Sequence, residues 1–271
     1  DLVTGGYVST TGDDSAAISI TSDGPVTVNS ALLNTAGADS NGAEIVSLSG
    51  PVLLDADVID TTGDRSLGAL IEAAGDIDVD IGVLRTEGAE AAGVSLTTDP
   101  AACVVLGTGA CDINGTLGDV ATGGVLAPGA RVRAAGAIGL DVDVLRTEGD
   151  QAVGLDLATS PTACATRWPG GCDTAFSVGD LQTLGLGSTG ALVRATGLTT
   201  ADVGVLRTAG DDAVGLDIAA DPAACVLLGS GACNVSTTVG ELTTEGADAV
   251  GVLIRAPADI GVDAGAVRTL G

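Results

Sequence analysis

The chain has 271 residues, of which 42 are glycine, and it contains one Trp, one Tyr and one Phe but no His or Met. Its formal charge of −26 repels nucleic-acid phosphates and anionic membrane surfaces, so neither is expected as a partner. The hydrophobic fraction of 45% excludes an acidic disordered tail, and no run of about 18 apolar residues is present to insert directly into a membrane as a helix. With so few aromatic residues, the core must consist of Val, Leu, Ile and Ala, which suits many thin layers better than one thick centre.

An internal repeat organises the chain. The segment 82–96 (GVLRTEGAEAAGVSL) returns as 143–157 (DVLRTEGDQAVGLDL) and 204–218 (GVLRTAGDDAVGLDI), and its opening returns as 265–271 (GAVRTLG). A period this strict is the signature of a repeat architecture. The copies place a threonine at strictly equal intervals, at Thr86, Thr147, Thr208 and Thr269, which defines a 61-residue repeat.

A shorter unit lies inside the 61-residue repeat. Its marker is Thr-x-Gly, and Ala121-Thr122-Gly123 is taken as the copy that follows Thr86. Successive markers lie 25 or 26 residues apart in short units and 35 or 36 residues apart in long units, and the two lengths alternate after Thr86. One short and one long unit therefore make up each repeat. The other markers are Thr10, Thr35, Thr61, Thr147, Thr183, Thr208, Thr244 and Thr269.

Within a unit the apolar residues recur with a period of two. In 76–81 (DIDVDI) three apolar residues alternate with three aspartates, and 152–157 (AVGLDL) has the same alternation. In 83–86 (VLRT), Leu84 and Thr86 share one face of the chain. Alternation of this kind is typical of strands with one buried face, and glycine clusters separate the runs.

Three short strands in about 25 residues are what one coil of a β-solenoid needs, because each coil hides its apolar face only against the next coil. We therefore predict an all-β, right-handed parallel β-helix with three sides, since parallel crossovers take that hand in most proteins. One solenoid is expected to span residues 1–271, with the double-coil repeat clearest from 86 to 271. Coils of about 25 residues would alternate with coils of about 36 residues, both within the range of solenoid repeats. A propeller or sandwich is the alternative, but neither explains the alternating unit lengths.

All the cysteines lie in the extra segments of the long units. These segments, 99–112, 160–173 and 221–234, each contain two cysteines eight residues apart. Six cysteines allow 15 pairings, but the repetition favours one local disulfide in each loop, worth about 2.5 kcal/mol by chain entropy. Disulfides indicate an oxidising compartment, and the absence of histidine weakens a zinc interpretation. The expected pairs are Cys103 with Cys111, Cys164 with Cys172, and Cys225 with Cys233.

Outward-facing charges also recur with the repeat. The aspartate position is expected to become Gly115, Ser177 and Thr238 in the intervening coils, and the arginine position to become Val120, Gln182 and Thr243. Like charges then lie about 10 Å apart, roughly one Debye length, which is typical of a solvated face. The expected columns are Asp80, Asp141, Asp202 and Asp263; Arg85, Arg146, Arg207 and Arg268; and Arg133, Arg194 and Arg255.

Coils rich in Gly, Ala, Thr and Asp, with sequence segments such as VLRTEGDQAVGL (144–155), resemble the passenger domains of bacterial autotransporters and related large secreted adhesins. The resemblance covers nearly the whole chain and lies in pattern and composition. It implies a right-handed parallel β-helix that is exported to the outer surface of a Gram-negative bacterium. Members of that family usually avoid cysteine, so the cysteine pairs of this chain depart from the family pattern.

These features predict an extracellular structural or adhesive surface protein: a repeat stalk, passenger or fibre subunit that displays loops. The segment 166–171 (TRWPGG) holds the only tryptophan, so Arg167 and Trp168 are candidate contact residues for a surface or matrix partner. No catalytic residue is predicted, because the carboxylates follow the repeat and no break in the repeat gathers an acid and a base.

Two alternatives from other classes remain open. The first is a polysaccharide-active β-helix enzyme, which needs carboxylates that converge in a cleft. The second is a calcium-dependent matrix module, in which Asp76, Asp78 and Asp80 offer hard oxygen ligands. Calcium is the only cofactor considered, and the glycine-rich repeat of calcium-binding β-rolls is absent.

The ends of the chain show no polar capping unit. An uncapped solenoid exposes strand edges that pair readily with another chain. We therefore expect either continuation in a longer repeat array or end-to-end self-association.

Overall fold

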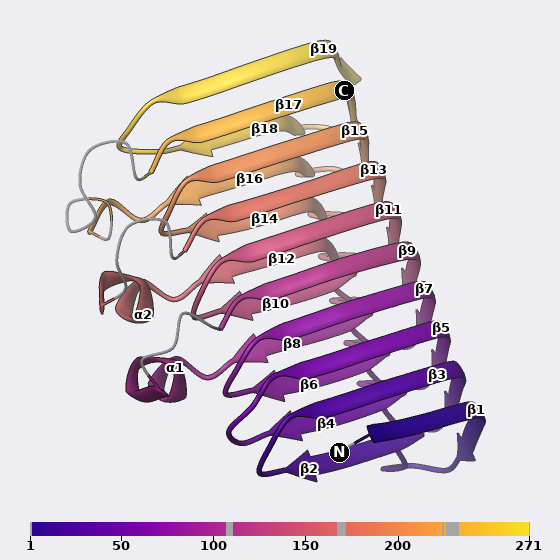
Figure 1. The fold of residues 1–271 in the computed structure, drawn as a ribbon. Helices are drawn as coiled ribbons and strands as arrows, with labels where there is room; N and C mark the ends of the chain where they lie inside the picture. Colours follow the sequence, from indigo (N-terminus) through magenta and orange to yellow (C-terminus); the bar gives the residue numbers. More distant parts are fainter. Residues whose placement is uncertain (1, 107–110, 167–171, 224, 226–232, 271) are drawn as a thin grey trace.

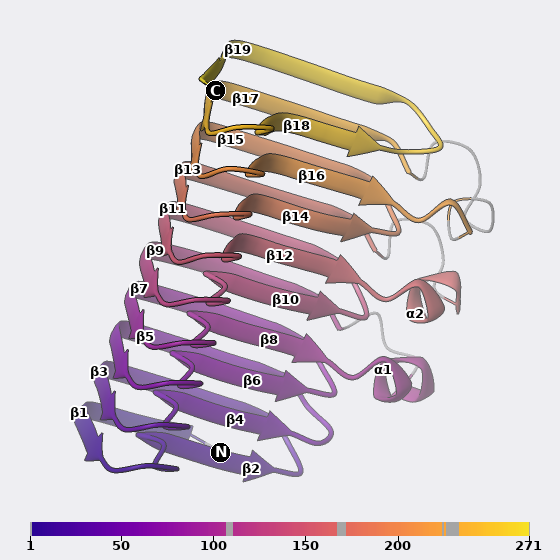
Figure 2. The same ribbon diagram turned by 180° about the vertical axis from the view of Figure 1, so that it is seen from behind.

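The computed structural model describes residues 2–106, 111–166, 172–223, 225 and 233–270. This part of the chain contains nineteen strands in two parallel sheets, one of ten strands and one of nine, together with two short helices (Figure 1). The long strands cross the front of Figure 1 from left to right, and Figure 2 shows that the short strands return along the back. With each turn the chain advances along the rod axis, from β1 at the bottom to β19 at the top. This path is right-handed, so the predicted right-handed parallel β-helix is confirmed.

The long strands belong to one sheet and the short strands to the other. The ten-stranded sheet, called sheet A below, contains β1 (Leu2–Thr11), β3 (Val26–Ala36), β5 (Val52–Thr62), β7 (Ile77–Glu87), β9 (Ile113–Gly123), β11 (Ile138–Glu148), β13 (Thr174–Leu184), β15 (Thr199–Ala209), β17 (Val235–Glu245) and β19 (Ile260–Leu270). The nine-stranded sheet B contains β2 (Ile18–Ser22), β4 (Ala43–Ser47), β6 (Ala69–Ala73), β8 (Val94–Thr98), β10 (Ala130–Ala134), β12 (Val153–Thr159), β14 (Thr189–Ala195), β16 (Val214–Ala220) and β18 (Val250–Arg255).

Each long strand supplies two of the three sides of the rod, because it changes face at a corner. In β7, alternate residues from Ile77 to Ile81 are buried, but Gly82 is exposed, Val83 is only partly buried, and burial resumes at Leu84. The ladder pairs Ile81 with Ala56 and Val83 with Val58, and skips Gly82 between them. The break in alternation that separates 76–81 from 83–86 in the sequence is therefore this corner.

The marker threonines form one column, as the repeat predicts. Thr86 pairs with Thr61 on one side and with Thr122 on the other, and Thr147 continues the ladder from Thr122. Each step along sheet A adds one coil, about 4.8 Å, so nine steps give a rod about 43 Å long. The remaining steps carry the column from Thr10 to Thr269 through Thr35, Thr183, Thr208 and Thr244.

The predicted register of the coil containing Thr122 is wrong by one residue. Thr122 itself pairs with Thr86, so the marker in this coil is Thr122-Gly123-Gly124. The long unit before Thr122 is therefore one residue longer than predicted, and the short unit after it is one residue shorter. The physical reason is that the turn needs glycine at position 124, where φ is +128°. The intervening positions in the charge columns are accordingly Thr116 and Ala121, in place of Gly115 and Val120, whereas Ser177, Thr238, Gln182 and Thr243 are confirmed.

The core is a stack of thin aliphatic layers. One continuous cluster of buried residues runs from Ile18 to Leu242, and the only aromatic side chain in it is Phe176. Because every coil contributes the same few inward positions, each layer packs on the one below it, and the apolar face of a coil is covered by its neighbours.

All the marker threonines except Thr10 and Thr269 are buried in a column inside this core. Thr147 is fully buried and its hydroxyl has no hydrogen-bond partner among the described residues, whereas the hydroxyl of Thr35 donates to the carbonyl of Ser40 at 3.0 Å. A buried hydroxyl without a partner loses its hydration and gains nothing in return. The same condition holds for Thr61, Thr86, Thr122, Thr183, Thr208 and Thr244.

Replacing Thr147 with valine is expected to raise the free energy of unfolding by about 1 kcal/mol, because the shape is kept and the unpaired hydroxyl is removed. Guanidinium unfolding followed by circular dichroism measures the change. Thr147→Ser is the matched control: it keeps the hydroxyl and deletes a buried methyl, so it should lower the stability by a similar amount. A valine variant less stable than the parent would show that the hydroxyl is satisfied in solution.

Candidate functional site

Loops closed by disulfides project from one corner of the rod. The structure confirms the three predicted pairs, with Cα–Cα distances of 6.0 Å for Cys103–Cys111, 5.8 Å for Cys164–Cys172 and 5.7 Å for Cys225–Cys233. Two of the loops begin with the helices α1 (Pro100–Leu106) and α2 (Pro161–Thr166). All leave the rod where a short strand ends, so they lie above one another along the same side (Figure 1).

The first two loops also pack on the rod. Cys103 and Cys111 are buried together with Ala135 and with Ala163 of α2. Ala135 belongs to the coil without a loop that lies between the first and the second loop. The backbone N–H of Ala135 donates to the hydroxyl of Thr98 at 2.7 Å at the base of the first loop. The described parts of the loops therefore form a ridge anchored on the coils. The predicted contact residues Arg167 and Trp168 lie outside the described residues.

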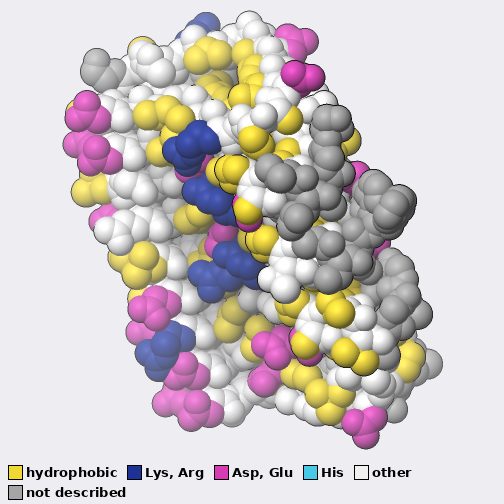
Figure 3. Space-filling model, turned by 90° about the vertical axis from the view of Figure 1, so that its left-hand side faces the viewer, with side chains coloured by type: hydrophobic (Ala, Val, Ile, Leu, Met, Phe, Trp, Pro, Cys, Tyr) yellow, Lys and Arg dark blue, Asp and Glu magenta, His cyan; other side chains and the backbone are white. Residues whose placement is uncertain are grey.

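A column of arginines runs along the outer face of sheet B. Arg133 and Arg131 flank the carboxylate of Asp156, to which Arg133 also donates a hydrogen bond. One repeat further on, Asp217 accepts from Arg194 at 3.1 Å and from Arg255 at 2.7 Å. Figure 3 shows basic side chains following one another along the rod, with acidic groups between them. Sequence reasoning found the column of Arg133, Arg194 and Arg255 but missed Asp156 and Asp217, although these two aspartates recur with the same period.

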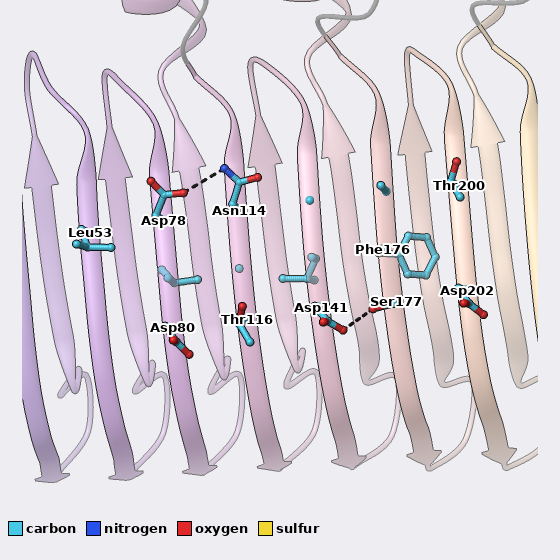
Figure 4. A pocket seen from close by; sticks show the side chains of 15 residues that line it. Leu53, Asp78, Asp80, Asn114, Thr116, Asp141, Phe176, Ser177, Thr200 and Asp202 are labelled. Atoms are coloured by element: carbon cyan, nitrogen blue, oxygen red, sulfur yellow. Dashed lines mark hydrogen bonds between the residues drawn. The ribbon is translucent and has the colours of Figure 1, made fainter.

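The outer face of sheet A carries a shallow depression of about 570 Å³. It forms because the outward positions Gly139 and Ala175 have small side chains, so the edges of the core residues Leu140 and Phe176 line it. Figure 4 shows the carboxylates of the aspartate column along one side of this depression. Asp141 accepts a hydrogen bond from Ser177, and Asp80 and Asp202 lie two coils away on either side.

The candidate calcium ligands Asp76, Asp78 and Asp80 are not gathered around a common point. Asp76 accepts the backbone N–H of Asp112 at 2.9 Å, and Asp78 accepts from the side-chain amide of Asn114 at 3.1 Å. Within the described ranges, no three acidic or cysteine side chains lie close enough together to hold a metal ion. Two of the three carboxylates thus bond to the adjacent coil.

One exposed ion pair joins consecutive turns of the rod. The Nε of Arg65 donates to Asp39 at 2.7 Å, and a second guanidinium nitrogen binds the other carboxylate oxygen. This guanidinium lowers the pKa of Asp39. Because both side chains are exposed to water, the pair contributes little to stability.

Asp173 carries a perturbed carboxyl at the base of the second loop. Desolvation raises the pKa of Asp173, and the hydrogen bond that it accepts from the backbone N–H of Leu198 at 3.0 Å opposes this change. A raised folded-state pKa means that ionisation destabilises the fold, so stability falls as pH rises from the unfolded-state value, near 3.9, through the folded-state value. The chain uses an amide at the equivalent position, where Asn234 accepts from the backbone N–H of Asp259 at 3.2 Å.

Asp173→Asn is therefore expected to stabilise the rod at pH 7 by less than about 1 kcal/mol, since solvent screens this half-buried group. The gain should disappear below about pH 4, where the carboxyl is protonated in both states. Thermal unfolding between pH 3 and pH 7 measures it. An equal gain in stability at pH 3 and pH 7 would contradict the raised pKa of Asp173. It would indicate that the asparagine forms a better hydrogen bond than the carboxyl group.

Similarity identifies no family for the chain. Comparisons with protein-family models, with curated proteins and with solved structures find no match. None of the helices in the described part is long and apolar enough to cross a bilayer. The function is therefore argued from the fold and from the surfaces that it presents.

Proposed function

We propose that this chain is an extracellular structural or adhesive surface protein, a rigid stalk that displays disulfide-closed loops on the outside of a Gram-negative bacterium. The observation that carries the proposal is the unbroken register of the coils, which places the loops in a single ridge on one side of a straight rod (Figure 1). The resemblance to autotransporter passenger domains supports the same role. Three disulfides are compatible with an oxidising environment outside the cytoplasm.

The last described coil presents an exposed apolar edge at the end of the rod. Ile260, Val262 and Val267 occupy inward positions, yet they are exposed by 45%, 49% and 54%. Their counterparts one coil earlier, Val235 and Leu242, are buried. A further coil, from the same chain or from a second copy stacked end to end, would cover these apolar side chains and pair with the free edge of β19.

Replacing the loops with the chain's own short turn tests the display role. The short coil of β10 and β11 passes from sheet B to sheet A through only three residues, 135–137. This turn can therefore replace 99–112, 160–173 and 221–234 while the coils keep their register. Anchored on bacterial cells, the loop-free rod is expected to keep its circular dichroism but to adhere at least tenfold less to glass coated with collagen or mucin.

A milder variant, Arg167→Ala with Trp168→Ala, separates a contact at the loop tip from a general effect of the ridge. It should retain the disulfides and lose adhesion if these two side chains make the contact. Equal adhesion of the loop-free rod and the parent protein on both coatings would refute loop display.

A further inference from the structure

The two sheets carry columns of opposite charge with the same spacing. On sheet B, Ala158 and Ala219 separate the members of the arginine column, so the cations recur every second coil. On sheet A, Thr116, Ser177 and Thr238 separate the aspartates in the same manner. Two coils correspond to about 9.6 Å in both columns. The columns are Arg133, Arg194 and Arg255 on sheet B, and Asp80, Asp141, Asp202 and Asp263 on sheet A.

The arginine column presents its positive charge outward. The side chains of Arg194 and Arg255 are exposed by 43% and 54%, whereas the carboxylate that they share, Asp217, is exposed by only 14%. Arg131 and Arg133 share Asp156 in the same way. Each cluster has two guanidinium groups for one carboxylate, so the part of this face from β10 to β18 has an excess of positive charge. The earlier part of the same face is acidic, because Glu44 and Glu72 occupy outward positions of β4 and β6.

The aspartate column has the opposite sign and a recessed surface. Asp80, Asp141 and Asp202 stand beside the depression at Gly139 and Ala175, where no long side chain covers the sheet (Figure 4). Sheet A faces the viewer in Figure 1 and sheet B faces the viewer in Figure 2, so the two columns lie on different sides of the rod.

We propose that rods pair side by side, with the arginine column of one copy docked against the aspartate column and depression of a second copy. The equal spacing lets every guanidinium along the column meet a carboxylate at once. The arginine column spans the four steps from β10 to β18, about 19 Å, and the part of sheet A before the corner is about 17 Å wide. The matched surface is therefore about 330 Å² per copy, the size of a weak contact that the paired charges must make specific. This interface joins two different faces, so it is heterologous, and repeated lateral association builds either a ring or an open array of rods.

This pairing goes beyond loop display and does not depend on it. At physiological ionic strength the Debye length is about 8 Å, so the long-range repulsion between two acidic rods is screened while direct ion pairs persist. Lateral contact also differs from end-to-end stacking, because it widens the particle and leaves its length unchanged.

Reversing the charge of one column at a time tests the pairing. One variant carries Arg133→Glu, Arg194→Glu and Arg255→Glu, and the other carries Asp80→Arg, Asp141→Arg and Asp202→Arg. Sedimentation velocity at 0.15 M salt should show concentration-dependent association of the parent protein and association at least tenfold weaker for each variant alone. An equimolar mixture of the two variants should associate again, because each acidic face then meets a basic face.

Electron microscopy and circular dichroism complete the test. Associated particles should be wider than single rods, and a variant with glutamine at the three arginine positions, which avoids new repulsion against Asp156 and Asp217, should also associate more weakly. A parent protein that stays a single rod at all concentrations, or a mixture that fails to associate, would overturn the pairing. Single rods that bind polygalacturonate through the arginine column would assign this face to an acidic glycan instead.

Discussion

Replacing Gly124 with alanine is expected to destabilise the rod by more than about 3 kcal/mol. Gly124 has φ of +128°, and an added Cβ would lie 1.9 Å from the carbonyl oxygen of Gly88 in the preceding coil. The new side chain would strain the turn and push two stacked turns apart, and both effects cost free energy. Because each coil is covered only by its neighbours, the damage should separate the coils before position 124 from those after it.

The adjacent residue provides the matched control. At Gly123 the nearest atom to an added Cβ is 4.0 Å away, and φ is not positive there. Gly123→Ala should therefore unfold at about the same guanidinium concentration as the parent protein, while Gly124→Ala unfolds much earlier and becomes sensitive to proteases near the turn. Equal unfolding midpoints for the two variants would disprove the corrected register.

Replacing Leu145 with alanine is expected to lower the free energy of unfolding by about 2 to 5 kcal/mol, the range for deleting a buried leucine side chain. Leu145 is fully buried and its methyl groups occupy the space beside Gly129 and Gly154, at which a Cβ would lie 2.7 Å and 3.0 Å from them. Gly129 directly precedes β10 and Gly154 lies in β12, and neither has a side chain to fill the cavity. Calorimetry or guanidinium unfolding measures the loss.

Val144 is the control for this substitution. It precedes Leu145 in β11 but lies at the corner of the strand and is only partly buried. Val144→Ala should cost less than about 1 kcal/mol, because it removes little buried surface. If the two alanine variants were equally unstable, the corner would not be where the structure places it.

The register error shows where a sequence pattern is insufficient. The segment ATGG at 121–124 contains two adjacent glycines, and either satisfies a search for a glycine close to a threonine. The space around them distinguishes the two, since only Gly124 lies against the backbone of the preceding coil. A one-residue difference in the marker then changes which residues stand in the aspartate and arginine columns.

The candidate surfaces were predictable only in part. The arginine column follows from the 61-residue period, and so do the cysteine pairs, because both repeat in the same phase as the coils. The depression beside Asp141 could not be found in this way. It depends on Gly139 and Ala175 being neighbours across two strands that are far apart in sequence.

The sequence by itself determined the solenoid, the inward and outward residues of each strand, and the local disulfides, because these depend on a period and on residues close together in the chain. The corner within each long strand, the shared carboxylates of Asp156 and Asp217, and the placement of the two charged columns on different sides of the rod became visible only in the tertiary structure. Those features depend on contacts between coils and on the path of the backbone in space, which no spacing along the chain specifies.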